Sequence, residues 1–500
     1  MFKDERRYEV WDEIRQSDLA TFRELLTDAV LRETAERAGL KVVRCALCGP
    51  HLIWLGIVAA MQCSLSFASV LTLTVRMLDL SANGLPESLA QARRREKRNS
   101  NRRKQQRSKH DPHGKDPVTV SEEAFAKARK LMPPVWWSCL IELLTERFEA
   151  EHAELVHWKQ FRMLALDGTT LRLPQKKRLK QHFGTSSNGK KRVAQARMTM
   201  LQLPLVRLPW RYELCPITEG ERTIAERMLK DLRKDDLVLM DQGFWSYGAF
   251  HQIQASRAYF GIRRYPRVKF RTIKRLGQHD RLVEWKMPSG PRWRQSGLPK
   301  SIRLRVIDYQ LAGFRPSAVV TNVLDPKQIS RDEWVHVTTE SEWGRPLDRA
   351  VRLRQGLYHR RWEIEVSFHE MKVTQKMESS LRSHTPESIH YEVAGHVVLY
   401  LLIRWLMVKA AQAAEDDGDP LGLSFKHAFE ELMMSWNVLI AAPPEQVVRL
   451  VRRLLGRIAS SQVPFRPGRH EPRPRNGKHK HRGKGKYTPS HKLESNQKQS

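Results

Sequence analysis

The spacing of apolar residues changes along the chain, and each spacing predicts a different kind of structure. Up to about residue 90, and again from 121 to about 153, the spacing is helical, as in the runs LIWLGIVAAM and VLTLTVRML. From Phe161 short apolar runs such as MLALD, LVLMD and AYFGI alternate with turns and one helical stretch, which is typical of an α/β core. Between about 267 and 322 the runs become all-β and basic, and helical spacing returns from about 357 to 458.

These changes predict an α/β protein built from six consecutive segments. Two of the segments are highly charged and lack apolar periodicity, so we expect no packed structure in them. The expected bounds are 1–90 for a helical N-terminal domain, 91–120 for a basic linker, 121–160 for a helical lead-in, 161–412 for an α/β domain with a β-rich insertion at about 267–322, 413–465 for C-terminal helices, and 466–500 for a disordered basic tail.

Two apolar stretches are candidates for a membrane span. Residues 52–75 contain no charged residue and are long enough to cross a bilayer, but serine, threonine and glutamine are frequent in their second half. The second stretch, residues 393–408, is shorter than the first and includes Arg404. We interpret the first stretch as two packed helices broken near CSLS and the second as a core helix, so we expect no membrane association.

The cysteines indicate a reducing compartment. There are five in 500 residues, and MFKDERRYEV is not a signal peptide, so we expect a cytoplasmic protein without a disulfide framework. Cys45 and Cys48 form a lone C-x-x-C near His51 and Cys63. A zinc site is conceivable there, but a second well-spaced ligand pair is missing, and small buried side chains are the favoured interpretation.

Positive charge is concentrated in three segments. The chain has 88 lysines and arginines against 55 acidic residues, for a net charge of +33. Residues 91–109, 267–315 and 466–500 carry +9, +10 and +9, so the rest of the chain is nearly balanced. Separate, strongly basic segments are typical of a polyanion-binding protein, because each neutralised phosphate releases a counterion. We therefore expect nucleic acid as the partner.

Two aspartates follow buried apolar runs. Asp167 comes after MLAL and Asp241 after LVLM, so we expect both at strand ends, where a rigid sheet meets solvent. Either aspartate alone is more often an ordinary turn residue. Together with Glu365 from a helix along the sheet, they would give three carboxylates, a set that can hold two hard divalent cations.

The segment LYHRRWEIEVSFHEMK predicts a helix with a distinctive face. Tyr358, Arg361, Glu365 and Lys372 fall within about 60° of one another at 100° per residue. A cationic stripe with one central acid suits a phosphodiester and its metal, although a solvated face of ion pairs is the ordinary alternative. The residues expected to face the core beside this stripe are Leu357, Ile364, Phe368 and Met371.

Two neighbouring acids are poor candidates for this site. Glu363 and Glu370 point about 140° or more away from the cationic stripe, which leaves Glu365 as the expected site carboxylate. His369 follows Glu365 by one turn and could contact a ligand, but a solvent-facing or structural histidine is the favoured interpretation.

The motifs LALDGTT, LVLMDQGF, TNVLDP and YHRRWEIEVSFHEMK resemble the DDE transposases of insertion-sequence family four, which carry a Tyr-Arg-Glu-Lys signature. The resemblance runs in order from about residue 161 to 406. It implies an RNase H-like catalytic core with a β-rich insertion before the glutamate helix. It also implies that Asp167, Asp241 and Glu365 form the catalytic, metal-binding triad. The signature residues that would grip phosphate at the element's ends are Tyr358, Arg361 and Lys372.

The function expected from these observations is DNA transposition. The protein would bind the inverted-repeat ends of its element through the helical N-terminal domain, cleave strands with two Mg²⁺ ions, for which Mn²⁺ could substitute, and join the ends to target DNA. A homodimer on paired ends and a nucleoid-associated location in bacteria are expected. A nuclease without strand transfer and a non-catalytic DNA-binding protein remain alternatives. Trp285 and Trp293 lie in the basic insertion, where they could stack on a displaced base or pack a small sheet.

Overall fold

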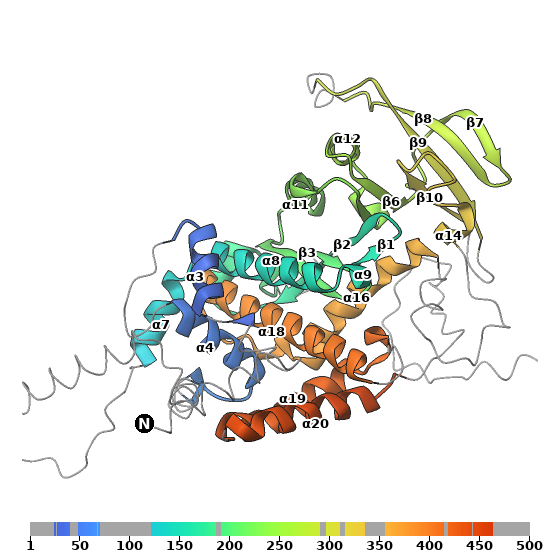
Figure 1. Cartoon of the computed structure of the whole chain (residues 1–500). Helices are drawn as coiled ribbons and strands as arrows, with labels where there is room; N and C mark the ends of the chain where they lie inside the picture. The colour runs from blue at the N-terminus through green and yellow to red at the C-terminus, as the bar shows by residue number, and fades with distance from the viewer. Residues whose placement is uncertain are drawn as a thin grey trace, which may run out of the picture.

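The structure, a computed structural model, has a large central sheet with helices packed around it (Figure 1). It is thus a mixed α/β protein with C-terminal helices, as expected. The residues that it describes are 25–26, 28–40, 49–67, 69–70, 122–186, 192–290, 297–310, 316–335, 356–414, 419–442 and 444–463.

The first half of the sheet combines parallel and antiparallel strands. β2, β5 and β6 run parallel to one another, and β3 and β4 extend the sheet antiparallel on the other side of β2. The order in this part is β4-β3-β2-β5-β6, with the short β1 pairing β2. The strands are β1 (His157–Trp158), β2 (Phe161–Arg172), β3 (Gln195–Leu203), β4 (Leu208–Pro216), β5 (Asp236–Met240) and β6 (Tyr259–Arg263).

The basic β-rich region continues the same sheet. Its last strand, β10, pairs antiparallel with β6, and the order then runs β10-β9-β8-β7 (Figure 1). The outermost strand has the sequence RTIKRLG, with three basic residues among seven, and lies exposed at the edge of the sheet. Residues 291–296 and 311–315 of the expected β-rich insertion lie outside the described residues. The bounds are β7 (Arg271–Gly277), β8 (Asp280–Lys286), β9 (Ser301–Tyr309) and β10 (Ser317–Thr321).

Helices pack against the core sheet and against one another. α8 packs against β4 and α18, α16 lies along β2, and α19 and α20 pack together beneath α18 in Figure 1. The helices are α3 (Asp28–Arg37), α4 (Gly49–Met61), α7 (Glu122–Leu131), α8 (Pro134–Glu151), α9 (Ala153–Val156), α10 (Lys177–Phe183), α11 (Glu221–Met228), α12 (Tyr247–Ala255), α14 (Arg331–Val335), α16 (Trp362–His369), α17 (Met377–Ser380), α18 (Pro386–Ala413), α19 (Phe425–Ala441) and α20 (Pro444–Ser460).

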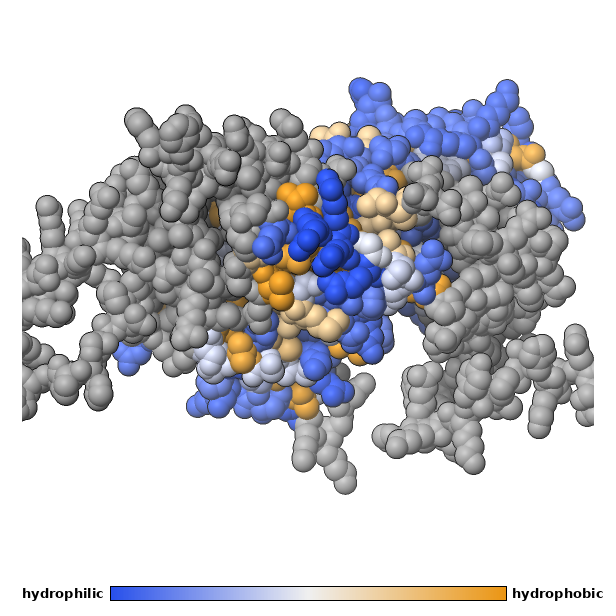
Figure 2. Space-filling model, turned by 60° about the horizontal axis from the view of Figure 1, so that its bottom comes forward, coloured by the Kyte–Doolittle hydropathy of each residue, from blue (hydrophilic) through white to orange (hydrophobic). Residues whose placement is uncertain are grey.

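The structure describes one of the two apolar stretches in full and the other in part. α18 is long and apolar enough to cross a membrane, but 94% of its apolar window is buried inside the protein, which confirms a core helix. α4 ends at Met61 and a turn follows, as expected near CSLS, while residues 71–75 lie outside the described residues. On the face in Figure 2, hydrophobic residues form separate patches between hydrophilic ones.

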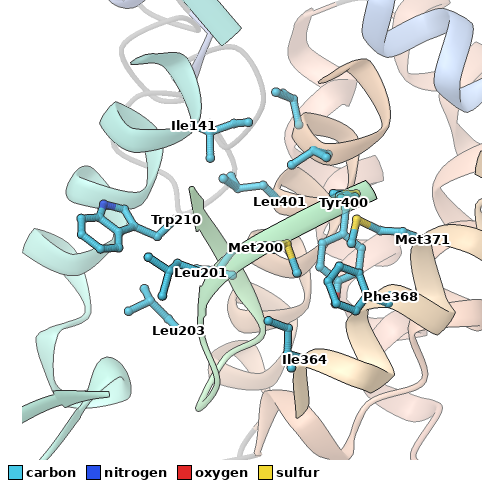
Figure 3. Packing of buried hydrophobic residues seen from close by; sticks show 14 of the residues in the cluster. Ile141, Met200, Leu201, Leu203, Trp210, Ile364, Phe368, Met371, Tyr400 and Leu401 are labelled. Atoms are coloured by element: carbon cyan, nitrogen blue, oxygen red, sulfur yellow. The ribbon is translucent and has the colours of Figure 1, made fainter. Parts of the chain in front are cut away.

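The inner strands of the sheet are buried on both faces by two hydrophobic clusters. Along β5, Val238 and Met240 belong to the larger cluster, and Leu237 and Leu239 to the smaller one. This alternation follows from the two-residue period of a strand. All four residues of the predicted core stripe are buried. Ile364, Phe368 and Met371 belong to the larger cluster and gather near the sheet and α18 in Figure 3. Leu357 belongs to the smaller cluster.

Candidate active site

Two of the expected carboxylates come from neighbouring parallel strands. β2 and β5 pair in parallel, and their last register pair is Leu166 with Met240. Asp167 and Asp241 are the next residues of the two segments, so both lie at the edge where β5 ends. Because neighbouring strands are only about 4.8 Å apart, this register keeps the two aspartates close together.

The expectation that Asp167 ends its strand is wrong. β2 continues from Asp167 through the Gly-Thr-Thr sequence to Arg172, because β3 supplies a ladder partner beyond the point where β5 stops. Asp241 does follow the last residue of β5, and it precedes the single 3₁₀ turn Gln242–Phe244. Asp167 is therefore held by an intact strand and Asp241 by the start of a turn.

Arg361 connects two of the three carboxylates. Its Nη1 lies 3.1 Å from Asp167 Oδ2, and its Nη2 lies 2.8 Å from Glu365 Oε1. The Arg361 side chain is only 5% exposed, and its pair with Asp167 is more buried than its pair with Glu365, whose side chain is 38% exposed. One guanidinium thus joins the end of the sheet to the glutamate helix.

The Asp167 carboxyl group is unusually basic. Burial raises its pKa to about 6, and the negative charges of Glu365 and Asp241 add to that increase. The Arg361 charge and a 2.8 Å hydrogen bond from the Gly168 amide act in the opposite direction. The contributions of Glu365 and Asp241 agree with the geometry, in which all three carboxylates lie near one another.

Asp241 has its own cationic partner, Arg263, which sequence reasoning did not single out. Arg263 is the last residue of β6, and its Nη2 lies 3.2 Å from Asp241 Oδ1. The run FGIRRYP contains no spacing that distinguishes this arginine from the many others. The parallel pairing of β5 with β6 brings the two side chains together.

The segment that carries Glu365 is not the single α-helix that was predicted. It begins as a 3₁₀ helix, Leu357–Arg361 (η4), continues as α16, and ends as a π-helix, Glu370–Thr374 (η5). Lys372 lies in the π-helix, where Nζ donates to the Thr170 carbonyl at 2.8 Å and to Thr169 Oγ1 at 3.3 Å. Lys372 therefore contacts the part of β2 that follows Asp167.

The Tyr358 hydroxyl is bonded to the backbone of two strands. It donates to the Met240 carbonyl at 3.0 Å and accepts from the Arg263 amide at 3.1 Å. Burial raises the Tyr358 pKa above its ordinary value, so the phenol stays protonated. This side chain lies beside Asp241, but its hydroxyl is already engaged.

The face opposite Glu365 is fixed by a buried ion cluster. Arg207, in the turn between β3 and β4, pairs with Glu363 at 2.6 Å and Glu370 at 3.1 Å. Glu370 also pairs with Arg404 and accepts a 2.7 Å hydrogen bond from the Tyr400 hydroxyl. Glu363 and Glu370, which the sequence places away from the Arg361–Lys372 stripe, are thus both held by Arg207 and have structural partners.

Sequence comparisons identify the family to which this chain is related. The profile of the family described as Transposase DDE domain matches residues 158–402, a range that contains Asp167, Asp241 and Glu365. The chain is 24% identical over 322 residues to the transposase InsG for insertion sequence element IS4 of Escherichia coli (strain K12), covering 63% of this chain and 68% of that protein. This chain belongs to the DDE transposases of the insertion-sequence 4 type.

A solved structure is also similar to this transposase. It is the cryo-EM structure of the piggyBac transposase synaptic complex with hairpin DNA, at 11% identity and a TM-score of 0.37, over 89% of this chain and 86% of that chain. A TM-score this low does not establish a shared fold.

The three carboxylates suit a hard divalent cation by their chemistry. Carboxylate oxygens are the ligands that Mg²⁺ prefers, and the Arg361 guanidinium already rests on two of these groups. Within the described ranges no group of three histidine, cysteine or acidic side chains is arranged to hold a metal ion as it stands. Arg361 pairs with both Asp167 and Glu365, so its guanidinium would have to move before those oxygens could share a cation.

The remaining candidate residues of the transposase lie apart from this site or outside the described ranges. Trp285 is only 6% exposed and packs against Trp245 and Tyr247, with ring centroids 5.3 and 5.0 Å apart. This placement matches the packing alternative and leaves Trp285 no free face for a base. His369 is exposed, as favoured. The residues outside the described part are Cys45, Cys48 and Trp293.

Proposed function

We propose that this transposase binds the inverted-repeat ends of its mobile element, cleaves them in a divalent-metal-dependent reaction and joins them to target DNA. The observation that carries the proposal is the convergence of Asp167, Asp241 and Glu365 around Arg361. The three acids come from β2, the end of β5 and α16, which are far apart in sequence. Three neighbouring carboxylates repel one another, so their convergence favours a role in binding a cation over a role in holding the fold together.

Asp167, Asp241 and Glu365 are the proposed ligands of two Mg²⁺ ions, for which Mn²⁺ could substitute. When bound, these ions would supply an activated oxygen nucleophile and neutralise the charge that develops on the leaving oxygen. The protein contributes the rigid placement of its carboxylates. Asp167 is held by an unbroken strand, and the Glu365 helix is anchored from behind by Arg207 and Arg404.

Arg361 and Lys372 are the proposed phosphate-binding residues. Arg361 can donate two parallel hydrogen bonds to a phosphate, and Lys372 offers a point charge on the same side of β2. Arg361 rests on Asp167 and Glu365 in the free protein. A phosphate that took over its guanidinium would leave both carboxylates available for metal.

An RNase H-like core and a DNA-bound homodimer complete the proposal. The core sheet order β4-β3-β2-β5-β6, with β3 and β4 antiparallel to the rest, supports that fold assignment. The net charge of +33 and the exposed basic strand β7 support DNA as the partner. Paired ends would each need an active site, which is the reason for proposing two subunits.

Product analysis can test strand transfer. The protein would be incubated with Mg²⁺, a linear duplex carrying the DNA that flanks its gene, and a supercoiled target plasmid. The proposal expects element ends covalently joined to the plasmid. Cut ends without joined products would favour the nuclease alternative, and bound but uncut DNA would favour a non-catalytic protein.

A further inference from the structure

The Tyr358 hydroxyl has a single proton, and that proton is already used. It is donated to the Met240 carbonyl, while one lone pair accepts from the Arg263 amide. A phosphate oxygen can only accept. Tyr358 therefore cannot donate to DNA unless it gives up its bond to Met240, which would leave a buried carbonyl without its partner.

Both backbone partners of this hydroxyl lead directly to Asp241. Met240 is the residue before it, and Arg263 is the residue whose guanidinium pairs with its carboxylate. Tyr358 itself precedes Arg361 and Glu365 in one continuous helical segment. A single oxygen thus connects the end of β5, the end of β6 and the segment that carries the glutamate.

The Tyr358 ring is held separately from its hydroxyl. It packs at the edge of the smaller hydrophobic cluster, which includes Leu239, Val319 and Leu357. Replacing tyrosine with phenylalanine would keep this packing and remove only the oxygen. The hydroxyl can therefore be tested without disturbing the core.

We propose that Tyr358 is a positioning residue, whose hydroxyl fixes Asp241 relative to Arg361 and Glu365. The proposal rests on the function proposed above, since it concerns the same three carboxylates. Its physical basis is the position of Asp241, which follows Met240, the last residue of β5, and precedes a 3₁₀ turn. No ladder pairing with β2 or β6 extends beyond Met240 to hold the backbone of Asp241. The backbone just before it is tied to the glutamate segment through the tyrosine oxygen.

The test compares Tyr358→Phe with Tyr259→Phe in the full-length protein. Tyr259 packs against the same cluster, and its hydroxyl makes no hydrogen bond to the described part of the chain, so Tyr259→Phe is a matched control. Mn²⁺ binding would be followed by the EPR signal of the free ion, without DNA. Affinity for a generic duplex, and kcat and KM for cleavage, would be measured in parallel.

The expected result is specific to Tyr358→Phe. Its Mn²⁺ affinity should fall about tenfold, as is typical when a group that orients a metal ligand is lost. DNA affinity and KM should stay at the wild-type level while kcat falls. Faster hydrogen exchange at the Arg263 amide would verify that the bond from this amide to the hydroxyl is lost. Tyr259→Phe should match the wild type in every measurement.

Two outcomes would overturn the proposal, and they are distinguishable. Wild-type Mn²⁺ affinity in Tyr358→Phe, with or without weaker DNA binding, would overturn the positioning role and leave the carboxylate site intact. If the wild type bound no more Mn²⁺ than Asp241→Asn, the three carboxylates would not form a metal site. That result would overturn the proposed metal site and the positioning role with it.

Discussion

Arg361 Nη1 lies 3.1 Å from Asp167 Oδ2, although the two residues are 194 positions apart in the chain. The same guanidinium pairs with Glu365 four residues later. In the free protein, this arginine therefore neutralises part of the charge that three neighbouring carboxylates would otherwise place at the end of β5.

Removing any one of the three carboxylates should abolish cleavage but spare DNA binding. We expect this of Asp167→Ala, Asp241→Ala and Glu365→Ala, because each change deletes a proposed metal ligand and leaves most phosphate contacts in place. Gel-shift and nicking assays in Mg²⁺ would measure the two properties. Asp332→Ala is a suitable control, since its side chain is 77% exposed. If a variant nicked DNA at the wild-type rate, the residue that it replaces would not belong to the site.

The raised pKa of Asp167 predicts a pH-dependent stability. Burial raises this pKa from 3.8 to about 6, so the folded state binds a proton that the unfolded state has already released. The resulting stabilisation is fully present below about pH 4 and is lost as the pH rises through about 6. For a shift of this size the loss is about 2–3 kcal/mol.

Denaturant unfolding in a chelating buffer at several pH values would measure this effect. Asp167→Asn is the matched variant, because its amide cannot titrate. Between pH 4 and 6 the wild type should lose more unfolding free energy than Asp167→Asn. Parallel curves for the two proteins would show that Asp167 titrates near its ordinary value.

Much of this site follows from sequence, and the remainder depends on packing. The apolar runs before Asp167 and Asp241 predict buried strands, and the signature spacing predicts that Arg361 and Glu365 share a face. The spacing could not reveal that the helix changes from 3₁₀ to α to π, because the buried residues Ile364, Phe368 and Met371 keep a helical spacing throughout. It also could not single out Arg263 among so many arginines, since only the pairing of β5 with β6 brings it to Asp241.

The ion cluster behind the glutamate helix should be a main source of local stability. Glu370 is buried and contacts Arg207, Arg404 and Tyr400, and these partners lower its pKa although burial acts against them. Glu370→Ala would leave two arginine side chains without their shared counterion. Breaking a buried pair from one side costs about 3–5 kcal/mol, which we expect as the loss in unfolding free energy.

The control for this measurement is Glu387→Ala. Glu387 also pairs with an arginine, at 3.2 Å, but its side chain is 45% exposed, so its loss should cost about 0–1 kcal/mol. Equal, small effects of the two changes would show that the buried cluster does not anchor the helix.

Replacing Arg361 should abolish DNA cleavage without weakening metal binding. Arg361→Ala removes the cation that rests on Asp167 and Glu365, so in the absence of DNA the variant should bind Mn²⁺ at least as tightly as the wild type. It should nevertheless lose cleavage, because the proposed two-point contact to the phosphate is gone. Arg361→Lys should restore cleavage only in part, since an ammonium cannot donate two parallel bonds.

These outcomes distinguish phosphate binding from an ordinary ion pair. Arg178→Ala removes an arginine that is 62% exposed and pairs with Glu387, so it should leave both Mn²⁺ binding and cleavage unchanged. If Arg361 served only to neutralise the carboxylates, Arg361→Ala would bind Mn²⁺ more tightly and cleave normally at saturating metal. Cleavage lost despite full metal occupancy would instead mean that the guanidinium acts on the DNA.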